Sequence, residues 1–127
     1  IVSTPRDLAL IDARKGLAMF NKVDVPVLGI VENMSTFIAP DTGKRYDIFG
    51  HGGAKKEAER LGVPFLGEVP LTMEIRETSD AGTPVVVSAP DGVAAQAYLE
   101  IARRMWESVL KNRAERTRPP PRIVIEQ

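Results

Sequence analysis

Short runs of mainly Val, Ile and Leu recur along the sequence and constrain its fold more than any other feature. Their residues do not alternate between apolar and polar, which is typical of parallel strands that are covered on both faces. The runs predict four strands, over Ile1–Ser3, Val25–Val31, Phe65–Val69 and Val85–Val87.

Segments with helical periodicity lie between these predicted strands. Apolar residues recur at steps of three and four over Leu10–Phe20 and Ala54–Leu61. A shorter pattern covers Leu71–Ala81, and a long helix is predicted after Asp91, a suitable N-cap residue. Trp106 lies on the apolar stripe of that helix and is expected in the core. Alternating strands and helices predict an α/β fold of parallel-sheet βαβ layers with right-handed crossovers.

The composition excludes several classes of function. Seventeen acidic and seventeen basic side chains balance, so we expect no nucleic acid and no membrane surface as partner. The chain has no cysteine, hence neither a disulfide framework nor a thiolate metal site, and no apolar run approaches the roughly 20 residues that span a bilayer. These features favour a cytoplasmic location. Because Ile1 already belongs to a predicted strand, we expect the chain to be part of a longer polypeptide.

Three motifs stand out in the sequence: V-E-N-M at the start of Val31–Gly53, I-V-S-T-P-R-D at Ile1–Asp7, and G-E-V-P at Gly67–Pro70. They resemble the Mrp/ApbC family of P-loop ATPases, which carry iron–sulfur clusters. The resemblance extends from Ile1 to about Leu110. It implies that residues 1–110 are the C-terminal half of a MinD/Mrp-like P-loop NTPase domain.

The resemblance also implies a nucleotide site at the carboxyl ends of the parallel strands, where open α/β sheets bind ligands. Asn33 would pair with adenine through its carboxamide, although an Asn here can also brace its own turn. Pro70 would flank the adenine ring or simply end its strand. Thr4 and Pro5 would lie near the phosphates, and the same residues are suited to start a helix, as N-cap and first helical residue.

The chain contains no G-x-x-x-x-G-K-[ST] phosphate loop. By resemblance, the full-length protein binds ATP and magnesium, hydrolyses ATP as a homodimer, and acts in iron–sulfur cluster assembly or transfer with apoproteins or assembly proteins as partners. This chain would supply the adenine side and part of the dimer surface. Alone, it is expected to have no ATPase activity.

One family feature is missing. Ala39 and Thr42 stand where many Mrp/ApbC members have the cysteines of a C-P-x-C pair, which hold a cluster between two subunits. Alanine has no donor atom and a threonine hydroxyl is a hard, neutral ligand, whereas such clusters are held by thiolates. We therefore expect no conventional cluster site here, and Asp41 or Asp47 would be unusual replacements.

The segment Thr36–Gly53 is longer than the two to six residues typical of a βα connection. Its apolar residues either pack beneath the segment or meet a partner subunit. His51 has no cysteine or second histidine as a companion, so the sequence does not predict a metal site around it. The glycines beside it are expected to let the chain turn into the next helix.

Residues 111–127 form a tail rich in Arg and Pro, with Ile123–Ile125 as a candidate edge strand or a loosely ordered end.

Two other functions remain open from the sequence. One is a non-catalytic α/β interaction module, and the other is a regulatory ATPase without a cluster.

Overall fold

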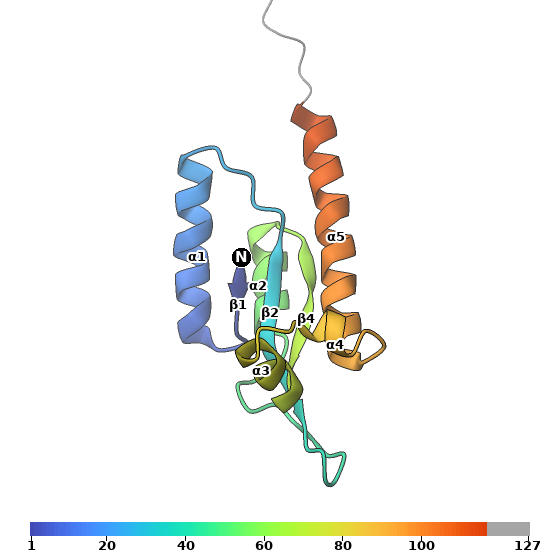
Figure 1. Ribbon diagram of the computed structural model, residues 1–127. Coiled ribbons are helices and arrows are strands. Elements are labelled where there is room, and N and C mark those ends of the chain that lie inside the picture. Colours follow the sequence, from blue (N-terminus) through green and yellow to red (C-terminus); the bar gives the residue numbers. More distant parts are fainter. Residues whose placement is uncertain (117–127) are drawn as a thin grey trace, which may run out of the picture.

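The computed structural model describes residues 1–116. Five helices and four strands follow one another along this part of the chain (Figure 1). In order they are β1 (Val2–Ser3), α1 (Asp7–Lys22), β2 (Ile30–Ile38), β3 (Arg45–Tyr46), α2 (Gly53–Leu61), β4 (Phe65–Leu71), α3 (Met73–Asp80), α4 (Val85–Ser88) and α5 (Val93–Arg116).

The sheet is built around β2, which pairs in parallel with β1 on one side and with β4 on the other. The far end of β2 pairs antiparallel with the short β3, so the complete sheet is mixed. Across the three parallel strands, Ser3, Glu32 and Glu68 stand at the same level. The α/β prediction with parallel strands is confirmed, with an added antiparallel hairpin.

Helices cover both faces of the sheet and make two apolar clusters. On one face, Ile30 packs with Leu10 of α1 and with Ala54 and Ala58 of α2. On the other face, residues of β2 and β4 pack against α3 and α5; these are Val31, Leu66 and Val69, with Ile75, Tyr98 and Ile101. In Figure 1, α2 lies behind the sheet and α5 runs beside β4. None of the helices in the described residues is long and apolar enough to cross a membrane.

Two predicted strands differ from the structure. Val85–Val87 is the start of helix α4, not a strand, because Pro84 opens a helical turn that packs against α5. The run Val25–Val31 belongs to a strand only from Ile30, where pairing with β4 and β1 begins. Short apolar runs do not distinguish a strand from a buried helical turn by periodicity.

Three local predictions are also wrong. Helix α1 begins at Asp7 with Arg6 as its N-cap, so Thr4 and Pro5 precede the helix. The segment Thr36–Gly53, expected to be a long connection after the strand, is partly a β-hairpin, because β2 continues to Ile38 and turns back into β3. Trp106 is 62% exposed and does not belong to the core of the described residues.

The last helix continues past the start of the predicted tail. α5 reaches Arg116, the last described residue, so residues 111–116 are helical. The candidate edge strand Ile123–Ile125 lies outside the described residues.

A carboxylate between two guanidinium groups joins α1 to α2. Arg14 donates from Nε and Nη2 to the two carboxylate oxygens of Glu57, at 2.7 and 3.0 Å. Arg60 donates to the same carboxylate from the next turn of α2. The hydrogen bonds from Arg14 and Arg60 lower the pKa of Glu57 from 4.5 to about 2.

We expect Glu57→Gln to lower the free energy of unfolding at neutral pH by about 1 kcal/mol. The loss is modest because the side chains of Arg14 and Arg60 are partly exposed, and water weakens their ion pairs with Glu57. The folded-state pKa is depressed, so the contribution of Glu57 is complete above about 4.5 and is lost as pH falls toward 2. Urea titrations across that range measure the difference between the two proteins. Glu59→Gln, on the exposed side of α2, is the control. A difference that stays constant down to the lowest pH would contradict the assignment.

Candidate functional site

A buried carboxylate lies where β2 meets the start of α2. The Glu32 side chain has no exposed surface, and it accepts hydrogen bonds from the backbone N–H groups of Gly52 and Ala54, at 2.9 and 2.8 Å. The first N–H groups of a helix have no partner within the helix, and the helix dipole favours a negative charge there. Glu32 therefore fixes the start of α2 against the middle strand of the sheet.

A bulge in β2 brings a hydroxyl onto the same carboxylate. Side chains three residues apart in a regular strand point to opposite faces. Between Asn33 and Phe37 the register with β4 shifts, and Met34 adopts a left-handed φ of 56°. As a result Ser35 turns back, and its Oγ lies 2.7 Å from Oε1 of Glu32.

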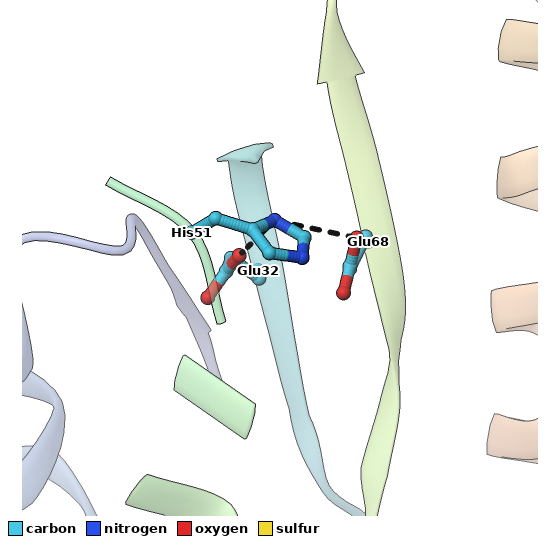
Figure 2. A group of neighbouring side chains, drawn as sticks. All are labelled: Glu32, His51 and Glu68. Carbon is cyan, nitrogen blue, oxygen red and sulfur yellow. Dashed lines mark ion pairs between the residues drawn. The ribbon is translucent and has the colours of Figure 1, made fainter. Parts of the chain in front are cut away.

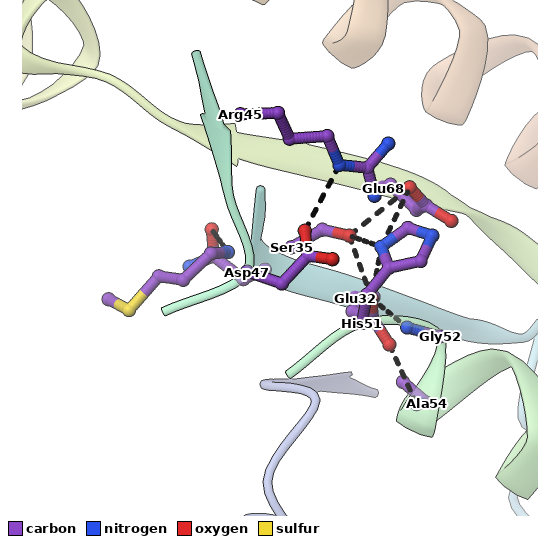
Figure 3. A network of polar contacts seen from close by, with 10 residues as sticks. Glu32, Ser35, Arg45, Asp47, His51, Gly52, Ala54 and Glu68 are labelled. Atoms are coloured by element: carbon purple, nitrogen blue, oxygen red, sulfur yellow. Dashed lines mark hydrogen bonds and ion pairs between the residues drawn. The ribbon is translucent and has the colours of Figure 1, made fainter. Parts of the chain in front are cut away.

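Two further polar groups meet at this serine. Oγ of Ser35 lies 3.1 Å from Nδ1 of His51 and 3.1 Å from Oε2 of Glu68. Figure 2 shows the His51 ring between the two carboxylates, and Figure 3 shows how all these contacts converge on Ser35. The imidazole Nδ1 is 3.9 Å from a carboxylate oxygen of each glutamate. We call Glu32, Ser35, His51 and Glu68 the polar cluster.

The sequence alone does not predict the polar cluster, because Glu32 and Glu68 are far from His51 along the chain. The pairing of β2 with β4 sets the two glutamates opposite each other, and the loop before α2 places His51 between them. The sequence carries one signal for the cluster. Glu32 and Glu68 each stand at the carboxyl end of an expected strand.

The residues predicted to contact a nucleotide are only partly brought together. Asn33 and Thr4 line one cavity of about 580 Å³ beside β1, together with residues of α1. This volume is within the usual range for small-molecule sites. Pro5 and Pro70 do not line this cavity. Pro5 is buried instead against the start of α2, where a Cβ on Gly53 would stand 2.2 Å from the carbonyl oxygen of Pro5.

Asn33 also braces its own turn. Its Oδ1 accepts a hydrogen bond from the backbone N–H of Met34, at 2.9 Å. A carboxamide oxygen has two lone pairs, and the amide NH₂ has two donors. No hydrogen bond of that NH₂ group is present among residues 1–116, so the group keeps donors available toward the cavity.

Positions 39 and 42 lie at the tip of the β2–β3 hairpin, which extends beyond the rest of the molecule (Figure 1). The backbone of Ala39 accepts from the N–H of Gly43 at 2.8 Å and donates to the carbonyl of Lys44 at 2.9 Å. Thr42 is exposed, and its backbone N–H donates a hydrogen bond to the Asp41 carboxylate. With a methyl group and a hydroxyl at these positions, the tip does not fit an iron–sulfur cluster.

Comparison with known sequences decides the family. The sequence model of the NUBPL iron-transfer P-loop NTPases, of the ParA group, matches residues 1–106. The chain belongs to the NUBPL iron-transfer P-loop NTPase family. The resemblance to cluster-carrying P-loop ATPases is thereby confirmed.

Named relatives of this NUBPL-family chain are similar over most of its length. An iron–sulfur cluster carrier protein of Deinococcus radiodurans is 55% identical, over 83% of this chain and 29% of the relative. The iron–sulfur cluster transfer protein NUBPL of Dictyostelium discoideum is 44% identical, over 98% of this chain and 39% of the relative. The chain thus spans about a third of the length of these curated relatives.

Solved structures agree with the fold of the NUBPL-family chain. A nucleotide-binding protein from Archaeoglobus fulgidus in complex with ADP is 33% identical, with a TM-score of 0.58, over 72% of this chain and 37% of that one. The cell division ATPase MinD of Pyrococcus furiosus is 23% identical, with a TM-score of 0.65, over 84% of this chain and 41% of that one. The fold is therefore that of MinD-type P-loop NTPases.

Proposed function

We propose that this chain is the C-terminal part of an ATPase domain whose complete protein acts in iron–sulfur cluster assembly or transfer. The observation that carries the proposal is the family match over residues 1–106, together with relatives named as iron–sulfur cluster carrier and transfer proteins. The complete protein works as a homodimer on iron–sulfur apoproteins in the cytoplasm.

Within this proposal, Asn33 recognises the adenine base. The remaining lone pair of Oδ1 accepts from the exocyclic amine of adenine, and the amide NH₂ donates to a ring nitrogen. Thr4 lies at the end of the neighbouring strand and lines the same cavity as Asn33. Pro70 lies within β4, which continues to Leu71 on the other side of β2, and in the complete protein its ring would offer an apolar surface to the base.

The phosphates and magnesium are held outside this chain in the proposed protein. A P-loop holds phosphates through backbone N–H groups and a lysine, and magnesium through a Ser or Thr hydroxyl. ATP bound in this way supplies the γ-phosphoryl group for hydrolysis. The residues of this chain orient the base and connect the nucleotide site to the hairpin through β2.

A regulatory ATPase without a cluster is the second candidate. The absence of thiolates at positions 39 and 42 favours it, since the hairpin tip has no soft ligand for iron. The two functions share the nucleotide site and differ in whether the complete protein carries a cluster.

We expect Asn33→Ala in the complete protein to weaken ATP binding by roughly 1–3 kcal/mol, because a buried polar partner on adenine is left unpaired. GTP presents a carbonyl where ATP presents an amine, so its affinity should change less. Titration calorimetry with both nucleotides measures the two losses.

Asp12 is the matched control for Asn33. It lines the same cavity from α1, and Asp12→Ala should leave the preference for ATP over GTP unchanged. If Asn33→Ala weakens both nucleotides equally, Asn33 only braces the turn at Met34, and the adenine assignment is wrong.

A further inference from the structure

We propose that Glu32, His51 and Glu68 form a binding site for one divalent transition-metal ion. The site is separate from the hairpin tip at positions 39 and 42 and from the cavity lined by Asn33. It therefore does not depend on the proposed nucleotide function. Its ligands would be one imidazole nitrogen and two carboxylate oxygens, with the hydroxyl of Ser35 beside them.

The distances suit a single ion. One ligand atom from each of the three side chains lies within 4.8 Å of the others. Two atoms that each lie about 2.1 Å from one ion can be at most about 4.2 Å apart. Nδ1 of His51 is 3.9 Å from an oxygen of Glu32 and 3.9 Å from an oxygen of Glu68. An ion between them therefore needs only small side-chain movements.

The polar cluster offers one hydroxyl proton to two carboxylates. Around Oγ of Ser35 stand two carboxylate oxygens and one imidazole nitrogen, at 2.7, 3.1 and 3.1 Å. The hydroxyl has one proton, so whichever tautomer His51 adopts, Ser35 can donate to only one of the two carboxylates. The two carboxylates also face each other across neighbouring strands, where like charges are destabilising. A cation among these atoms removes both problems.

The surrounding structure holds the ligands in place. Glu32 is fixed by the N–H groups at the start of α2, which are the kind of outer partners that orient metal-binding carboxylates. His51 and Glu68 are only about two-thirds buried, so water and an ion can reach them. The buried glutamate thus forms the floor of the site, and the other two ligands form its open side.

The ligand set selects the class of ion. Imidazole suits zinc, copper, iron and nickel, whereas calcium and magnesium prefer sites made of oxygen atoms only. One imidazole with two carboxylates and open positions for water favours Fe(II), Mn(II), Co(II) or Zn(II). Co(II) is the useful probe, because its visible absorption reports the ligands and their geometry.

The test is a Co(II) titration of the metal-free full chain, without nucleotide, followed by visible absorption and by the melting temperature. The native chain should bind one Co(II) and melt at a higher temperature in its presence. Glu68→Gln and His51→Gln should each weaken binding by at least tenfold, because changes even behind the ligands of metal sites cost about 10- to 100-fold in affinity.

Asp47→Asn is the matched control, because Asp47 is a nearby carboxylate that pairs with Arg45 outside the polar cluster. Its Co(II) affinity should equal that of the native chain. The proposal is overturned if the native chain shows no saturable Co(II) binding, or if both cluster variants bind Co(II) as tightly as Asp47→Asn does. Circular dichroism of each metal-free variant establishes that the fold is retained.

Discussion

Anaerobic reconstitution of the Ala39→Cys, Thr42→Cys double variant with iron and sulfide is expected to give a stable brown chromophore that the native chain does not form. The native chain has no cysteine, so the two new side chains would be the only thiolates of the protein. They stand at the tip of the exposed hairpin, where two subunits can each contribute a pair. Absorption spectra and iron analysis measure the cluster.

Cluster formation should also strengthen dimerisation, since each subunit supplies half of the ligands. Size-exclusion chromatography with and without iron and sulfide measures this effect. The Ala39→Ser, Thr42→Ser double variant changes the same positions without thiolates and should remain colourless. A stable cluster spectrum from the native chain would show that Asp41, Asp47 or another ligand replaces the cysteines.

Glu32→Ala is expected to cause the largest loss of stability among the single variants considered. It leaves the N–H groups of Gly52 and Ala54 without their partner in a buried place. Each unsatisfied buried donor costs about 1–3 kcal/mol, so the free energy of unfolding should fall by roughly 3 kcal/mol. Urea unfolding followed by circular dichroism measures the loss.

Glu59→Ala is the control for this prediction. It removes the same side chain from the exposed side of α2 and should change stability by less than about 0.5 kcal/mol. If both variants unfold at the same urea concentration, the buried carboxylate does not hold the start of α2.

The sequence predicts much of the fold because its strongest signals are local. The periodicity over Leu10–Phe20 and Ala54–Leu61 corresponds to α1 and α2, and the apolar run at Phe65 corresponds to β4. Where the signal depends on packing partners, prediction fails. Val85–Val87 has strand-forming residues but becomes helical against α5, and Trp106 follows an apolar stripe yet is exposed.

The polar cluster was beyond sequence reasoning for a different reason. It depends on the register between β2 and β4 and on a bulge at Met34, and no local sequence pattern predicts either feature. Only this bulge allows Ser35 to share a face with Glu32. The nucleotide residues Asn33 and Thr4, by contrast, follow from the rule that ligands bind at strand ends, and their role stays a prediction.

The bulge in β2 has a consequence for how the length of this chain can vary. Inserting or deleting one residue between Glu32 and Ser35 would turn the serine hydroxyl to the opposite face and break the contacts that hold the polar cluster together. At the hairpin tip, between Ile38 and Arg45, added residues would only lengthen an exposed turn. We therefore expect natural length differences among relatives to concentrate at the tip, while the spacing between the glutamate and the serine stays fixed.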